Sequence, residues 1–156
     1  MEKLNFEVKI NAPAQTVWAT MLEDATYREW TSAFSENGSY YEGDWNQGSE
    51  IRFLGPDDDG SLGGLIATVE ESRPHEFLSL RYLGQIVGGV DDRTSDAAKA
   101  FIGAHENYSF TESDGVTLVE VELESEDDWA DMLKDAWPGA LAKLKELAEA
   151  RGRDGR

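Results

Sequence analysis

Carboxyl groups are the most abundant reactive side chains in this sequence. It contains 32 aspartates and glutamates, two histidines and no cysteine. The absence of cysteine excludes thiol nucleophiles, disulfides and sulfur ligands for metals. General acid–base chemistry would therefore have to rest on His75, His105 or a buried carboxylate, and no sequence pattern pairs these groups. His75 follows Pro74 at an expected turn, which favours a position on the surface.

The short motifs of familiar catalytic and cofactor sites do not occur. His75 and His105 both lack the second histidine that a zinc hydrolase motif carries one helical turn later. There is no Gly-x-Ser-x-Gly, and the glycines between 60 and 64 have neither dinucleotide nor phosphate-loop spacing. The acidic run 57–60 resembles part of a calcium loop, but Ile66 would occupy the twelfth ligand position, so we interpret it as a solvated turn. We expect no metal and no cofactor.

Strand alternation makes Glu106 the candidate for a polar group inside the protein. One face of this strand carries Glu106, Tyr108 and Phe110, and the other carries His105, Asn107 and Ser109. If the aromatic pair faces inward, Glu106 does too, and Arg81 or Tyr82 on a neighbouring strand would share its polar contacts. The alternative, which the rarity of unpaired buried carboxylates favours, leaves Glu106 at the strand end in water.

The N-terminal third is expected to form one strand and two short helices. Residues 4–10 alternate between apolar and polar, which predicts a half-buried strand. Pro13 suits the first turn of a helix that Asn11 could cap. A second short helix or turn should follow through Tyr27 and Trp30.

The pattern of residues 38–124 predicts an antiparallel meander of six strands. Together with the strand over residues 4–10, this gives seven strands. Short alternating runs are separated by Gly, Pro, Asp and Asn residues that favour turns. The segment 84–102 interrupts this pattern, because Gly84, Gly88 and Gly89 indicate a mobile loop. Residues 96–102 could add one or two helical turns.

The C-terminal part predicts a long amphipathic helix. Apolar residues recur there at spacings of three and four from Trp129 to Leu147, and Ser125 with Asp128 resembles a capping box. Pro138-Gly139 should kink this helix or split it. We expect one domain over residues 1–150, followed by a polar tail over 151–156 that frays.

Composition restricts the partners. The formal net charge of −18 repels phosphate backbones and anionic lipid surfaces, so we expect neither nucleic acid nor membrane binding. The start of the sequence lacks a signal-peptide pattern, no stretch is apolar enough to span a bilayer, and cysteine is absent. These features predict a cytoplasmic protein.

The order of elements is strand, helices, strands and long helix, which favours an α+β fold. A sheet of this length twists and curls, and the terminal helix is suited to cover its concave face.

Three stretches in this order resemble the START-like superfamily, also called SRPBCC or birch-pollen-allergen-like. They are Ile10-Asn11-Ala12-Pro13 with Val17-Trp18, then Trp30, and then Trp137-Pro138-Gly139-Ala140-Leu141 with Leu144-Lys145. The branch that the sequence resembles is that of the C-terminal domain of the heat-shock protein 90 ATPase activator. The resemblance covers nearly the whole chain and implies a helix-grip fold with a hydrophobic cavity between sheet and helix.

The resemblance and the strand pattern together nominate a set of ligand-binding residues: Trp30, Phe53, Leu80, Tyr82, Glu106, Tyr108, Trp129, Leu133 and Trp137. The tryptophans among them could equally pack the core. A kink at Pro138-Gly139, together with the 84–95 loop, could gate the entrance.

Three functions follow from these expectations. The first is non-enzymatic binding of a small hydrophobic or amphipathic ligand in the cavity. The second is a co-chaperone-like protein-binding module whose acidic surface attracts a basic partner. The third is a cyclase- or hydrolase-type enzyme that uses Glu106 or His105. The sequence leaves the ligand and the oligomeric state open.

Overall fold

The computed structural model describes residues 2–34, 38–56 and 59–154, and their side chains except those of 127–129 and 152–154. The capping box at Ser125 and Asp128 and the turn at Asp57 and Asp58 therefore lie partly or wholly outside the described residues.

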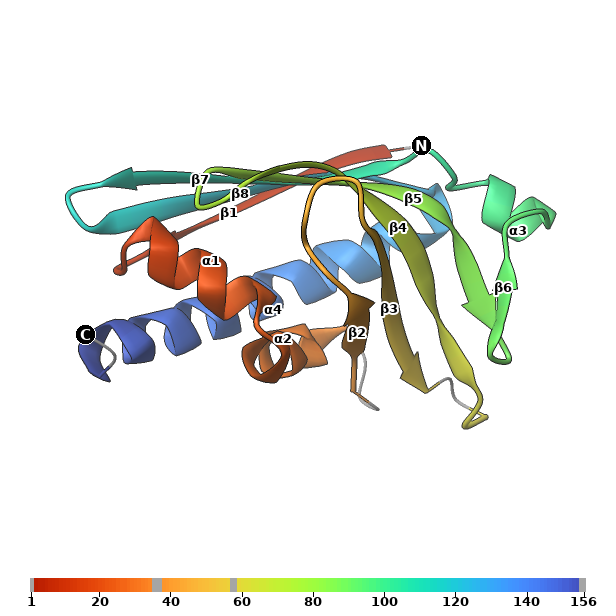
Figure 1. Ribbon diagram of the computed structural model, residues 1–156, viewed down its shortest axis with the longest axis horizontal. Helices are drawn as coiled ribbons and strands as arrows, with labels where there is room; N and C mark the ends of the chain where they lie inside the picture. The colour runs from red at the N-terminus through yellow and green to blue at the C-terminus, as the bar shows by residue number, and fades with distance from the viewer. Residues whose placement is uncertain (1, 35–37, 57–58, 155–156) are drawn as a thin grey trace.

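An antiparallel sheet of eight strands forms one side of the molecule (Figure 1). The strands are β1 (Glu2–Ile10), β2 (Tyr40–Gly43), β3 (Glu50–Pro56), β4 (Leu62–Arg73), β5 (Phe77–Val87), β6 (Val90–Asp92), β7 (His105–Ser113) and β8 (Val116–Ser125). Their order in the sheet is β1-β8-β7-β5-β4-β3-β2, with β6 paired to β5.

Helices α1 (Ala14–Leu22), α2 (Asp24–Trp30) and α4 (Asp127–Asp154) gather on the concave side of this curved sheet, whereas α3 (Asp96–Lys99) lies beside β5 and β6 (Figure 1). A 3₁₀ turn (Thr31–Ala33) follows α2. α4 runs beneath the sheet, and α1 and α2 lie beside α4 (Figure 1). The arrangement confirms the predicted α+β helix-grip fold, with two short helices after the first strand and a long helix at the end. Among the described residues, no helix combines the length and the hydropathy that a membrane crossing requires.

The hydrophobic core lies between the sheet and the C-terminal half of α4. Ala140, Leu141, Leu144 and Ala148 are each 3% exposed or less. They meet inward-facing strand residues such as Val119, whose side chain is fully buried. Full burial of each large aliphatic side chain contributes about 2 kcal/mol, so this half of the helix fixes α4 to the sheet.

The segment predicted as a mobile loop contains the eighth strand. β5 continues through Gly84 to Val87, and Gly88-Gly89 turns the chain into β6 with φ values of 58° and 78°. Two glycines at positive φ form the tight hairpin turn that the twist of antiparallel strands favours. Arg52 of β3 donates hydrogen bonds to both carboxylate oxygens of Asp91, at 2.5 and 2.7 Å. The prediction of a loop was wrong over residues 84–92, whereas α3 confirms the expected helical turn.

The start of α1 differs from expectation. Pro13 occupies the N-cap position, and the side chain of Asn11 does not cap the helix. The backbone N–H of Ala14 instead donates a 2.8 Å hydrogen bond to Oε1 of Glu112 from β7. A carboxylate at the positive end of a helix dipole is favourable. Glu112 therefore acts as the cap of α1, although it belongs to a strand that is distant in the sequence.

α4 is continuous through Pro138, so of the two predicted effects of Pro138-Gly139, a kink or a split of the helix, the split is wrong. Pro138 and Gly139 lie on the exposed face of the helix, while Trp137 and Ala140 on either side of them are buried. Pro138 has no N–H group, so the backbone carbonyl four residues earlier loses its helical donor, and water can replace that donor on the exposed face. The buried residues before and after Pro138-Gly139 hold the helix against the sheet. The helix extends past residue 150 to Asp154, and Arg151 donates to Glu23 Oε2 at 3.1 Å.

Removal of the cap that β7 provides should destabilise the protein. We expect Glu112→Ala to lower the free energy of unfolding by about 1 kcal/mol, as loss of an N-cap does. Urea denaturation checks this value. Glu120→Ala, at an exposed glutamate of β8, is the matched control. An equal loss in both variants would contradict a role for Glu112 as the cap.

Candidate functional site

A pocket of about 660 Å³ lies between the concave face of the sheet, α2 and the N-terminal half of α4. Strands β3 to β5 and β7 form its walls on one side, and Leu133 and Trp137 of α4 form the other. Most of its lining is aromatic or aliphatic. Glu106 of β7 contributes a carboxyl group to this wall.

Eight of the nine nominated residues line this pocket. They are Trp30, Phe53, Leu80, Tyr82, Glu106, Tyr108, Leu133 and Trp137. The ninth, Trp129, belongs to α4, and its side chain is outside the described part of the chain. The structure therefore brings together residues from five elements, α2, β3, β5, β7 and α4, that are separated in the sequence.

Glu106 is bound by two tyrosines. The hydroxyl of Tyr82 donates to Glu106 Oε1 at 3.0 Å, and the hydroxyl of Tyr108 donates to Oε2. Tyr108 shares the face of Glu106 because it lies two residues further along β7. Leu80 of β5 is directly opposite Glu106, so Tyr82 reaches the carboxyl from the diagonal position.

The carboxyl is held at the pocket wall and does not lie at a strand end in bulk water, so that alternative is wrong. The part of Glu106 that remains accessible faces the pocket. Of the two partners considered for it, Tyr82 is the one that binds. Arg81 lies on the other face of the sheet, with Nε 3.9 Å from Glu70 Oε1.

Burial sets the protonation of this cluster. Desolvation raises the pKa of the Glu106 carboxyl, while the hydrogen bonds from Tyr108 and Tyr82 act in the opposite direction. Desolvation, together with the charge of Glu106, also raises the pKa of both tyrosine hydroxyls well above their ordinary value. The hydroxyls therefore stay protonated and remain hydrogen-bond donors to the carboxylate.

Aromatic rings surround the cluster on two sides. The ring of Tyr108 lies 6.1 Å from that of Trp137, and the ring of Tyr82 lies 6.2 Å from that of Phe101. Such spacings are typical of favourable aromatic contacts. Trp137 also meets Phe34 edge-on at 5.0 Å.

Several lining aromatics were missed by the sequence analysis, namely Tyr27, Phe34, Trp45 and Phe101. Trp45 lies among turn residues between β2 and β3, and its ring is 5.9 Å from that of Phe53. An aromatic residue among polar turn formers was an available signal, because such a ring must find a packing partner.

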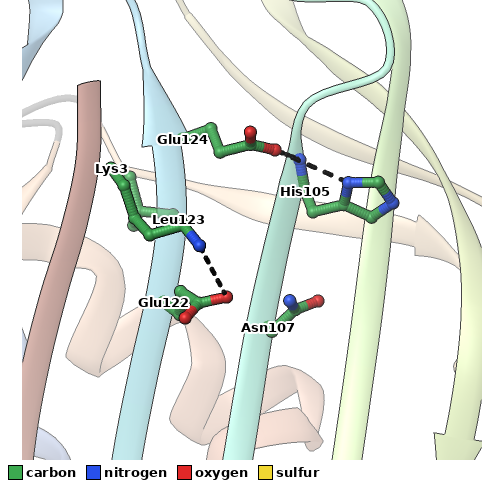
Figure 2. A pocket seen from close by; sticks show the side chains of 6 residues that line it. All are labelled: Lys3, His105, Asn107, Glu122, Leu123 and Glu124. Atoms are coloured by element: carbon green, nitrogen blue, oxygen red, sulfur yellow. Dashed lines mark hydrogen bonds and ion pairs between the residues drawn. The ribbon is translucent and has the colours of Figure 1, made fainter. Parts of the chain in front are cut away.

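The outer face of the sheet carries different chemistry. A second hollow of about 230 Å³ there is lined by Lys3, His105, Asn107, Glu122, Leu123 and Glu124 (Figure 2). Nε2 of His105 is 2.6 Å from Glu70 Oε2, and its Nδ1 is 3.5 Å from Glu124 Oε1. His105 and Glu106 thus lie on opposite faces of the sheet and cannot act on one substrate together.

His75 is exposed at its turn, edge-on to Trp18 at 6.1 Å, as the sequence favoured. Over the described residues, no group of three or more histidines and carboxylates has a geometry that could hold a metal ion.

Solved structures of low sequence identity share the fold. An AHSA1-like protein from Aeromonas hydrophila has a TM-score of 0.69 at 20% identity, over 97% of this chain and 94% of that one. The Aha1 dimer from Colwellia psychrerythraea has a TM-score of 0.66 at 17% identity, over 96% and 97%. A protein of the dynemicin biosynthetic locus has a TM-score of 0.63 at 14% identity, over 96% of this chain and 48% of that one.

No protein-family model matches the sequence, and no curated protein matches it significantly. The structural likeness confirms the START-like fold that the sequence resembled. At these identities the likeness extends to the fold alone.

Ionisation of Glu106 should oppose folding. Because its pKa is raised in the folded protein, its contribution to stability is complete below the unfolded pKa and is lost as pH rises through the folded pKa. Tyr27, Tyr82 and Tyr108 are the titratable groups that act on it. We expect Glu106→Gln to be more stable than the parent by about 1 kcal/mol near pH 8, with the difference vanishing near pH 4.

Urea denaturation across this pH range measures the difference. Glu120→Gln, which removes one exposed carboxylate, should show no such pH dependence. If the parent had the higher free energy of unfolding at pH 8, the hydrogen bonds from the tyrosines would stabilise the ionised carboxyl by more than desolvation destabilises it.

Proposed function

We propose that this chain of START-like fold binds a small hydrophobic or amphipathic molecule between its sheet and α4, without reacting with it. The observation that carries the proposal is the pocket of about 660 Å³ with aromatic walls and one carboxyl group. Ligand sites are typically apolar hollows of about 300–1,000 Å³ with a few polar groups that fix orientation.

The walls supply the affinity in this proposal. Trp30, Phe53 and Trp137 approach the pocket from three different elements, so a guest would lose water on several sides at once. Each Å² of apolar surface removed from water contributes roughly 25 cal/mol before the costs of immobilising the guest.

Catalysis is not part of the proposal because the described groups do not form an acid–base pair. The carboxyl of Glu106 is bound by two tyrosines that stay protonated, and His105 faces away from the pocket. General acid–base catalysis needs a proton acceptor and a donor within reach of the same substrate.

The pocket should bind N-phenyl-1-naphthylamine, a neutral apolar fluorophore, at one molecule per chain. Leu133→Trp places a large ring in the pocket from α4 and should weaken binding about tenfold or more, as steric loss in apolar pockets does. Fluorescence titration measures the affinity, and a rise in melting temperature with the probe shows binding to the native form.

Val90→Trp is the matched control, because it adds the same bulk at a residue that is 67% exposed on the β5–β6 hairpin. Its affinity should equal that of the parent. If the probe does not bind the parent, or if both variants bind like the parent, the pocket is not the binding site.

A second candidate is a co-chaperone-like protein-binding module, and the outer face of the sheet favours it. Alternate residues of β8, Glu120, Glu122 and Glu124, form an acidic row there. Glu7 of β1 is directly opposite Glu120, although like charges in such pairs destabilise a sheet. This row, on a chain of net charge −18, would attract a basic protein surface. Two proteins of the same fold are described as Aha1 and AHSA1-like.

The paired variant Glu120→Gln with Glu122→Gln tests this candidate. With purified heat-shock protein 90, we expect the parent to change the ATPase rate, the effect to fall as salt rises, and the variant to be weaker by about threefold or more. Glu29→Gln with Glu146→Gln, on the helical side, matches the charge change. An ATPase rate that the parent leaves unchanged would dismiss this candidate.

A further inference from the structure

The polar centre of the pocket offers hydrogen-bond acceptors. Each tyrosine hydroxyl has one hydrogen, and both Tyr82 and Tyr108 give theirs to Glu106. The acceptor capacity that remains around Glu106 is the other lone pairs of the carboxylate and of the two hydroxyl oxygens. The part of a guest that lies beside Glu106 must therefore donate hydrogen bonds or carry positive charge. The indole N–H groups of Trp45 and Trp137, which line the same pocket, are buried donors without a hydrogen-bond partner among the described residues.

The charge of the lining has one sign. Glu106, Glu124 and Glu126 belong to it, and none of the described lining residues is a lysine, arginine or histidine. The carboxylate of Glu124 is engaged with His105 on the outer face, and Glu126 lies in the connection between β8 and α4. Glu106 is therefore the carboxyl group held within the wall of the sheet. A buried charge without a counter-ion is costly, and a cationic guest would provide the missing partner.

The rings beside Glu106 are suited to the same guest. The carboxyl lies between the Tyr108–Trp137 pair and the Tyr82–Phe101 pair. Aromatic faces carry partial negative charge and attract ammonium groups, most strongly when water is excluded. The negative field of the whole chain adds a long-range attraction for cations.

We infer that the guest is an organic cation, an amine or quaternary ammonium on an apolar body, whose charged nitrogen lies beside Glu106. The inference rests on the proposed function, since it specifies the chemistry of the guest in the same pocket. The apolar body occupies the part of the pocket lined by Trp30, Phe53 and Leu133.

Three probes of similar shape separate charge from hydrophobicity. They are (2-naphthylmethyl)trimethylammonium, its uncharged carbon isostere 2-neopentylnaphthalene, and the anion 2-naphthylacetate. Each is titrated against bound N-phenyl-1-naphthylamine at one pH and one ionic strength. We expect the ammonium to bind about tenfold or more tightly than the isostere, and the anion to bind least.

The variant Glu106→Gln should remove the preference for the ammonium while the affinity of the isostere stays the same. Glu120→Gln loses the same charge on the outer face and should keep the preference, which separates the local carboxylate from the field of the whole chain. Tyr82→Phe, which removes one donor to Glu106, should keep a preference for the cation, and so serves as a second variant of the cluster.

The outcomes separate the two proposals. Equal or tighter binding of the isostere or the anion would overturn the cationic guest, while displacement of the fluorophore would still support the pocket as a binding site. A preference that survives in Glu106→Gln would also overturn it, because the charge would then be recognised elsewhere. If neither the fluorophore nor any probe binds, the proposed function itself fails.

Discussion

The contact between α4 and the concave face of the sheet determines both the stability of the fold and the shape of its interior. The C-terminal half of α4 is sealed against the sheet by Ala140, Leu141 and Leu144, each 3% exposed or less. The N-terminal half contributes Ala130 and Trp137 to the same core, and its Leu133 and Trp137 also line the pocket. Because the sheet curves, the C-terminal half of α4 belongs to the core, whereas the N-terminal half forms part of the core and also a wall of the pocket.

The polar cluster depends on that arrangement. Glu106 could not stay in an apolar wall without partners, and the two tyrosine hydroxyls satisfy both of its oxygens. The same burial that raises the pKa of the carboxyl keeps the tyrosines protonated. The site therefore carries a cost in stability that packing elsewhere offsets, which is common where a protein keeps a polar group for binding.

The sequence predicted the features that follow from local periodicity. The alternation of β7 placed Glu106 with Tyr108, and the spacing of apolar residues placed Leu133 and Trp137 on one face of a helix. It could not predict contacts between distant segments. The cap that Glu112 gives to Ala14, 98 residues away, has no local signature. The glycines of the β5–β6 hairpin are compatible with a loop as well as with a hairpin. The contact between Arg52 and Asp91, which is distant in sequence, favours the hairpin.

The sheet has an inner face at the pocket and an outer face of different chemistry. Adjacent residues on one strand belong to opposite faces. His105 contacts Glu70 and Glu124 outside, while Glu106 contacts tyrosines inside. Because successive side chains of a strand point to opposite faces, a change on one face leaves the other largely intact. Binding of a small molecule and attraction of a basic protein therefore need not compete for the same residues. They would be linked only through β7 and β8, whose outer residues form the acidic row and whose inner residues hold α4.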